Sequence, residues 1–218
     1  MEKRLSPWAW VSTLYFLEGI PYVIVNNISV VMFTKMGVPN GEMALFTSLL
    51  YLPWMIKPFW SPFVDVMKTK RWWTVTMQLI MSIAFVLLVL TLPIPSAEDI
   101  ANGTTPMSLF MVTLILFVVT AFASATHDIA ADGFYMLGLD TGTQAEFVGI
   151  RSTFYRLSNI FGQGVLVAIA GWVELEYKDI PLSWQVTLIV ATVVFGLVTI
   201  YHLFIIPKPD ADRPTIEG

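Results

Sequence analysis

The stretch WWTVTMQLIMSIAFVLLVLTLPI, residues 72–94, decides the fold class of this chain. It contains no charged residue, and a helix of about 20 apolar residues is long enough to cross the hydrocarbon core of a bilayer. A strand of a membrane barrel would be shorter and would alternate between apolar and polar positions. The stretch therefore predicts a membrane-spanning α-helix.

The composition of the whole chain agrees with a membrane protein. Hydrophobic residues make up 56% of the 218 residues and charged residues 13%, whereas soluble domains carry about 25% charged residues. An aromatic content of 14% argues against a disordered chain. The absence of cysteine excludes disulfides and thiolate metal sites. A net charge of −4, without a long basic run, argues against nucleic-acid binding.

Six apolar segments are predicted to span the membrane, so the fold class is an all-α membrane protein with six transmembrane helices. The segments cover about residues 8–33, 43–64, 72–94, 107–137, 147–173 and 184–206. We expect residues 1–206 to form one six-helix transmembrane bundle. Residues 207–218 are polar and rich in proline, and we expect them to begin a central cytoplasmic linker.

The distribution of basic residues predicts the orientation of this bundle. One side of the membrane receives most of them: Lys3, Arg4, Lys68, Lys70, Arg71, Arg151, Arg156, Lys208 and Arg213. The other side receives Lys35, Lys178 and an acidic set, Glu42, Glu98, Asp99, Glu174, Glu176 and Asp179. Because cytoplasmic loops carry the excess of Lys and Arg, both termini are expected in the cytoplasm.

A polar stripe runs along the first predicted span. Glu18, Tyr22, Asn26 and Ser29 are spaced by four, four and three positions, so they share one face of a helix. Ionisable residues at membrane depth are costly and usually face a protein interior or a water-filled cavity. The stripe indicates a cavity-lining face with Glu18 as a proton-coupling or substrate-binding carboxylate. A helix-packing stripe, with Glu18 protonated or paired, is the alternative.

The fourth predicted span carries two carboxylates, Asp128 and Asp132, four positions apart on one face. Two close carboxylates in a low dielectric need a neutralising cation. Arg151 and Arg156, near the start of the next span, are the favoured partners, in a structural network or in a coupling site. A metal ion held by His127 together with the two carboxylates is a further alternative, although His127 points about 100° away from Asp128.

The fifth predicted span places Arg151, Tyr155, Ser158 and Gly162 on one side of a helix. A guanidinium group binds carboxylate and phosphate groups through two parallel hydrogen bonds. Arg151 is therefore suited to an anionic substrate group, and equally to a structural pair with Asp128 or Asp132.

The loop between the second and third predicted spans resembles a loop motif of the major facilitator superfamily. That motif places a glycine, an aspartate four residues later, and then basic residues. Here Ser61 replaces the glycine, Asp65 holds the acidic position, and Lys68, Lys70 and Arg71 supply the positive charges.

Three other segments resemble the AmpG-like permease branch of that superfamily, which includes muropeptide and acetyl-CoA transporters. They are YFLEGIPY (15–22), LPWMIKPFWSPFVD (52–65) and SATHDIAADGFYM (124–136). His127 stands where glutamine is common in muropeptide permeases. The resemblance covers the N-terminal six-helix half of a twelve-span fold. It implies a fragment, or one half that works with a missing C-terminal part or with a homodimer partner.

The resemblance further implies a secondary active transporter in the inner membrane. Such a protein moves a small polar solute, such as a muropeptide, a sugar or a related metabolite, by proton symport and by alternating access together with a second six-helix half. The implied cavity residues are Glu18, Tyr22, Asn26, Asp128, Asp132, Arg151 and Tyr155, and the implied gating loop contains Asp65, Lys68 and Arg71. Expected partners are the lipid bilayer, the solute, protons and a second six-helix half. No catalytic residue, metal or other cofactor is expected.

Two rival functions follow from the same residues. The first is an intramembrane metal-dependent enzyme that uses His127, Asp128 and Asp132. The second is a membrane subunit or sensor that transports nothing.

Overall fold

The computed structural model describes residues 6–214, and the regular structure in this part of the chain is helical. The first half contains α1 (Pro7–Val23), η1 (Ile24–Ile28), α2 (Ser29–Lys35), α3 (Asn40–Leu49), α4 (Leu52–Met55), η2 (Lys57–Phe59), α5 (Ser61–Val66) and α6 (Lys70–Thr91). The second half contains α7 (Ala97–Asn102), η3 (Met107–Phe110), α8 (Met111–Gly138), α9 (Thr141–Ile160), η4 (Phe161–Leu166), α10 (Val167–Tyr177) and α11 (Ile180–Ile205).

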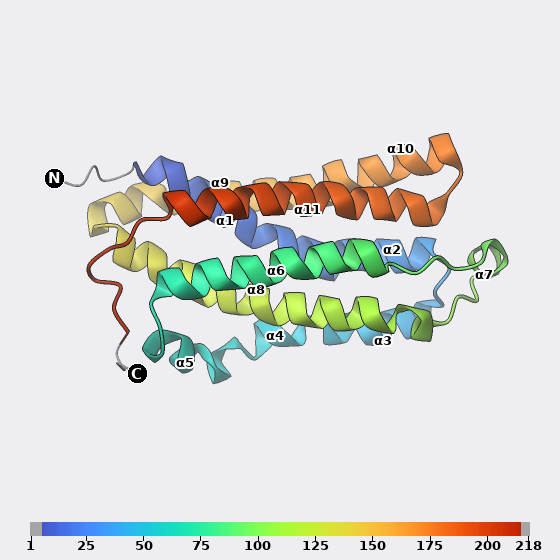
Figure 1. The fold of residues 1–218 in the computed structure, drawn as a ribbon, viewed down its shortest axis with the longest axis horizontal. Helices are drawn as coiled ribbons and strands as arrows, with labels where there is room; N and C mark the ends of the chain where they lie inside the picture. Colours follow the sequence, from blue (N-terminus) through green and yellow to red (C-terminus); the bar gives the residue numbers. More distant parts are fainter. Residues whose placement is uncertain (1–5, 215–218) are drawn as a thin grey trace.

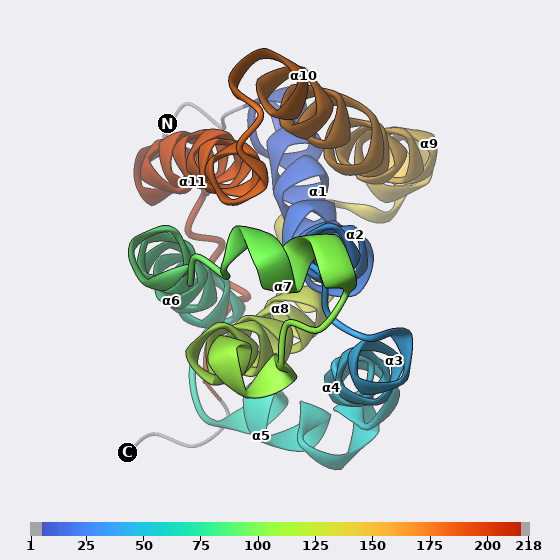
Figure 2. The same ribbon diagram turned by 90° about the vertical axis from the view of Figure 1, so that its right-hand side faces the viewer.

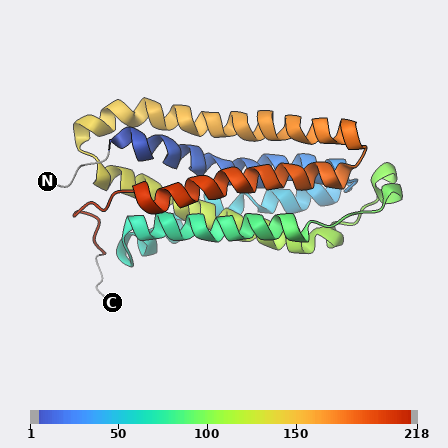
Figure 3. The ribbon, with the colours of Figure 1, turned by 45° about the horizontal axis from the view of Figure 1, so that its top comes forward.

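Five continuous helical segments in the described part of the chain are long and apolar enough to cross a membrane. They are Pro7–Lys35, Lys70–Thr91, Met107–Gly138, Thr141–Tyr177 and Ile180–Ile205. They run side by side along the long axis of the molecule (Figure 3). The prediction of an all-α membrane fold is confirmed, and these five helices correspond to five of the six predicted spans.

The remaining predicted span, residues 43–64, is not a single helix. The chain here forms α3, α4, η2 and α5 in succession. Pro53, Pro58 and Pro62 each lie in the first turn of one of the later short helices. Proline has no backbone N–H and its ring clashes with the preceding turn, so it can begin a helix but interrupts one that is already running.

The fifth predicted span begins earlier in the structure, at Thr141 rather than near residue 147. Asp140 is the N-cap, and its carboxylate accepts hydrogen bonds from the Thr143 N–H (3.1 Å) and the Thr143 hydroxyl (2.8 Å). These bonds hold the pKa of Asp140 below its usual value. A cap marks where a helix begins, whereas hydropathy marks only where it becomes apolar.

The helix α1 lies in the middle of the bundle, with α6, α8, α9 and α11 around it (Figure 2). Its closest approach is to α9 and η4, and glycine makes that approach possible. A Cβ at Gly19 would overlap Ser158, and a Cβ at Gly162 would overlap Val23. Small residues at a helix interface let the two backbones approach in this way.

Two π-helical turns interrupt the helices near this contact. The turn η1 joins α1 to α2, and η4 joins α9 to α10, and the two turns lie against each other. A π-helical turn inserts one residue into an α-helix and is frequent at functional sites. Here the two turns change the direction of the helices that follow them, α2 and α10.

Candidate functional site

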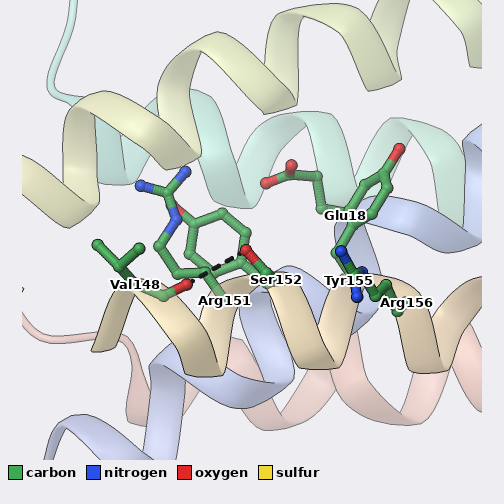
Figure 4. A pocket seen from close by; sticks show the side chains of 7 residues that line it. Glu18, Val148, Arg151, Ser152, Tyr155 and Arg156 are labelled. Carbon is green, nitrogen blue, oxygen red and sulfur yellow. Dashed lines mark hydrogen bonds between the residues drawn. The ribbon is translucent and has the colours of Figure 1, made fainter. Parts of the chain in front are cut away.

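Two adjacent cavities open on the faces of α1, α8 and α9. The larger has a volume of about 510 Å³ and is lined by Tyr15, Glu18, Val148, Arg151, Ser152, Tyr155 and Arg156. The smaller has a volume of about 260 Å³ and is lined by Glu18, Tyr22, Trp54, Lys57, Ser124, Asp128 and Tyr155. Glu18 and Tyr155 line both cavities. In Figure 4 the α9 side chains follow one another along the helix, with the carboxyl group of Glu18 opposite them.

Three charged residues that line these cavities, Glu18, Asp128 and Arg151, lie at one level of the bundle. The start of α1, the end of α8 and the start of α9 are at the same end of the molecule (Figure 1). At a rise of about 1.5 Å per residue, Glu18, Asp128 and Arg151 each lie about 15 Å from that end. A bilayer core is about 30 Å thick, so a core that begins at that end of the bundle would have its middle at this level.

Arg151 forms an ion pair with Asp132. Its guanidinium carbon lies 4.3 Å from the ring centroid of Tyr15 and 4.5 Å from that of Tyr135. The Tyr15 hydroxyl donates a hydrogen bond to the same Asp132 carboxylate, at 2.9 Å. Two aromatic faces and one carboxylate thus hold the Arg151 head group in place.

Asp128 forms its ion pair with Lys57 rather than with an arginine. Lys57 is the first residue of η2, in the broken segment that packs against α8. The expectation that Arg151 or Arg156 would neutralise both carboxylates is therefore wrong for Asp128. Lys57 is the lone basic residue inside the second predicted span, which indicates the need for an acidic partner but does not identify Asp128 as that partner.

Glu18 is the third carboxylate of this group, and it has no cation beside it in the ion pairs of the described residues. The residue is 8% exposed, and its Oε2 has no hydrogen-bond partner in the described part of the chain. An unpaired carboxylate is costly at membrane depth. A proton or an exchangeable cation would neutralise it.

The other predicted cavity residues fall into two groups. Tyr22 and Tyr155 line the cavities. Asp132 lines neither cavity but holds Arg151. Asn26 also lies outside both cavities, contrary to the prediction. It belongs to η1 and is 2% exposed, because the π-helical turn rotates it away from the Glu18 face into the bundle.

His127 faces away from the two carboxylates. Its Nε2 lies 2.9 Å from the Gln78 side-chain nitrogen, and the Gln78 oxygen lies 3.1 Å from Nδ1 of His202. Asp128 and Asp132 meanwhile bind Lys57 and Arg151. In the part of the chain that the structure describes, no group of three or more His, Asp or Glu residues could hold a metal ion. The geometry therefore gives no support to the metal-dependent alternative.

The predicted loop residues lie at the end of the bundle that carries both ends of the described chain (Figure 1). Asp65 pairs with Lys70, whose ammonium group also donates to the Val64 carbonyl at 3.1 Å. Lys70 was predicted as a basic residue of the loop motif but not as one of the gating residues. Lys68 was predicted as a gating residue, but it forms no ion pair with a described residue.

Arg71 connects this loop to the end of α11. Its guanidinium group donates to the carbonyls of Leu203 and Ile206, both at 3.2 Å. The segment after α11 folds back, and the Asp212 carboxylate accepts the backbone N–H groups of Lys70 (2.6 Å) and Arg71 (2.9 Å). The first residues of the predicted linker are thus tied to the start of α6, and residues 215–218 lie outside the described part.

The long apolar helices and the buried charges define the class: this is a helical integral membrane protein. No protein-family model matches the chain. Its curated relatives include "Putative transporter AmpG 4" of Rickettsia felis, 28% identical over 199 residues, which cover 89% of this chain and 44% of the relative. The protein of the same name in Rickettsia conorii gives the same identity and coverage. An uncharacterized protein of Schizosaccharomyces pombe is 27% identical over 152 residues, covering 65% of this chain and 28% of that protein.

The chain is therefore a distant homologue of proteins named as putative AmpG transporters, which confirms the resemblance of its sequence segments to that group. It spans less than half the length of these relatives.

Proposed function

We propose that this chain is one six-helix half of a secondary active transporter that moves a small polar solute, such as a muropeptide, a sugar or a related metabolite. The observation that carries the proposal is the pair of adjacent cavities, which Glu18 and Asp128 line together with the paired cations Lys57 and Arg151. Ionisable groups at this depth are costly and mark solute or ion pathways. The names of the two rickettsial relatives support the same function. Such transport requires no catalytic residue or bound cofactor.

The proposal includes a sixth passage through the membrane, made by residues 36–69. Both ends of the described chain lie at the same end of the bundle, which requires an even number of passages (Figure 1). The helices α3, α4 and α5 follow one another along the bundle, from the end of α2 to the start of α6 (Figure 1). Broken backbone is tolerated at membrane depth where it lines a cavity, and Lys57 of this segment lines one.

A second six-helix half completes the transporter in this proposal. It is either more of the same polypeptide or a second copy of this chain. In transporters built from repeats, the solute site lies near the bilayer midplane between the halves. Glu18 lies at that level, so the solute would bind between this cavity and the second half. Rocking of one half against the other would expose the site to each side in turn.

Protons drive the transport, and Glu18 is the group that takes them up. Asp128 and Asp132 already have cations, whereas Glu18 has none among the described residues. Protonation of Glu18 would remove the uncompensated charge and allow the cavity to close. Loss of the proton would restore that charge and favour contact with water.

The loop residues Asp65, Lys68 and Arg71 form the gate at the end of the bundle with both termini. The Asp65–Lys70 pair and the Arg71 bonds join the start of α6 to α5 and α11. In our proposal this end lies on the cytoplasmic side of the inner membrane. Its described basic residues support that orientation, while Lys3 and Arg4 lie outside the described part of the chain.

Transport itself is tested with membrane vesicles that contain this chain together with its second half. We expect an imposed pH gradient to drive accumulation of at least one labelled sugar, sugar acid or peptide from a panel. Collapse of the gradient with a protonophore should abolish the accumulation. Vesicles that take up no member of the panel above the rate of empty vesicles would favour the sensor or subunit alternative.

A further inference from the structure

Arg156 is a guanidinium group without a partner in a cavity whose other cations are paired. It lines the larger cavity and is exposed. It forms no ion pair and no side-chain hydrogen bond with any residue that the structure describes. Arg151, one and a half turns earlier on α9, is held by Asp132 and by two tyrosine rings.

The position of Arg156 along α9 places it inside the membrane. It lies fifteen residues after the start of the helix, which corresponds to about 22 Å. The same helical segment continues to Tyr177, so neither end is within reach of an arginine side chain. An arginine that cannot reach the interface needs a polar partner or a water-filled cavity.

Three polar residues lie near Arg156 on the same helical segment. Ser152 and Thr153 precede it by one turn on α9, Gln163 follows by two turns on η4, and all three are exposed. The helix segment Thr141–Tyr177 also has the lowest mean hydropathy of the five candidate spans, 1.2. Exposed Leu157 and Ile160 lie beside these polar residues, so the side that carries Arg156 is mixed rather than continuously apolar.

We infer that Arg156 is the anion-binding group of this cavity and that it takes a carboxylate or phosphate group of the solute. This inference rests on the proposed function, in which the cavity receives a solute. A free guanidinium binds such an oxyanion through two parallel hydrogen bonds. Arg151 is excluded from this role because its head group is already occupied by Asp132.

Glu18 complements Arg156 in the same cavity. Its Oε2 has no partner among the described residues and the residue is more than nine-tenths buried. A carboxylate accepts hydrogen bonds when ionised and donates one when protonated. The solute class is therefore an acid that also carries hydroxyl, amide or amino groups near the acidic group, and an uncharged sugar would lack the first contact.

The test is the rate at which phenylglyoxal modifies individual arginines of the full chain in membranes, measured by peptide mass spectrometry. We expect Arg156 to react faster than Arg151, whose guanidinium is paired and stacked. Glucuronate or glucose 6-phosphate, at about ten times its dissociation constant, should slow the modification of Arg156 about tenfold, because the unoccupied fraction then falls to about one tenth. Glucose should leave the rate unchanged. Arg213, exposed in the segment after α11, reports non-specific protection.

Three results would overturn the inference. The first is that neither anion protects Arg156, and the second is that both anions protect Arg213 equally. The third is that Arg156 is unreactive because a carboxylate of the second half already covers it. An independent measurement is the rise in melting temperature caused by glucuronate, which should vanish in Arg156→Gln and persist in Arg213→Gln. Both readouts report binding alone. A chain that binds the anion but accumulates no solute would contradict the proposed transport and leave the anion site standing.

Discussion

Replacement of Glu18 by glutamine is expected to abolish pH-gradient-driven accumulation of the solute while leaving the protein folded. The amide has nearly the same shape as the carboxyl group but cannot take up or release a proton. An ionised acidic group near the middle of a membrane helix costs about 3 kcal/mol, which corresponds to about 100-fold in the ratio of two conformational states. Loss of this titration should reduce gradient-driven accumulation by a similar factor, measured in the vesicle assay.

The matched control for this prediction is Glu146→Gln. Glu146 is an exposed carboxylate on the same helix as Arg151, near its start, and it lines neither cavity. It undergoes the same chemical change, and we expect accumulation to remain unchanged. If Glu18→Gln accumulated solute as well as the unmodified protein does, Glu18 would not be the coupling residue.

The second large effect is expected for Lys57→Met, which leaves Asp128 without its cation. The two side chains are 30% and 19% exposed, so the pair is largely but not fully removed from solvent. Breaking a buried pair on one side costs about 3–5 kcal/mol, and we expect about 2–3 kcal/mol here after allowance for this exposure. That loss corresponds to a melting temperature about 5–10 °C lower in a chain of this size.

The double variant Lys57→Met/Asp128→Asn distinguishes a broken pair from a general packing defect. Removing both charges should recover most of the loss, because no uncompensated carboxylate remains. Lys35→Met is the control for an exposed pair. Lys35 and Glu174 are 49% and 28% exposed, and such surface pairs contribute about 0–1 kcal/mol. Additive effects of Lys57→Met and Asp128→Asn would show that the two side chains do not interact.

The five long helices could be predicted because each contains a long apolar run, and length and hydropathy are local properties of a sequence. The pairing of Arg151 with Asp132 was similarly accessible. The two residues belong to consecutive helices joined by a short turn, so similar distances from that turn place them at similar depth. Helix periodicity also predicted that His127 faces away from Asp128.

What could not be predicted depends on contacts between distant parts of the chain. Lys57 meets Asp128 across 71 positions, and the contact exists because prolines break the segment that carries Lys57. The burial of Asn26 follows from a π-helical turn, which shifts the helical phase after Pro21 and which residue spacing alone does not indicate. The bonds of Asp212 to the start of α6 are equally remote in sequence.

The central claim is that a water-accessible polar cavity lies at mid-membrane depth on α9. Because the 218 residues contain no cysteine, one introduced thiol gives an unambiguous signal. Ser152→Cys lines the cavity about 16 Å from the end of the bundle with both termini, and Val193→Cys lies on the exposed apolar face of α11, about 18 Å from that end. The decisive measurement is the rate at which a charged, membrane-impermeant methanethiosulfonate labels each thiol in intact membranes. We predict rapid labelling at position 152 and none at 193. Equal rates at the two positions, or no labelling of the Ser152→Cys thiol from either side of the membrane, would contradict the account.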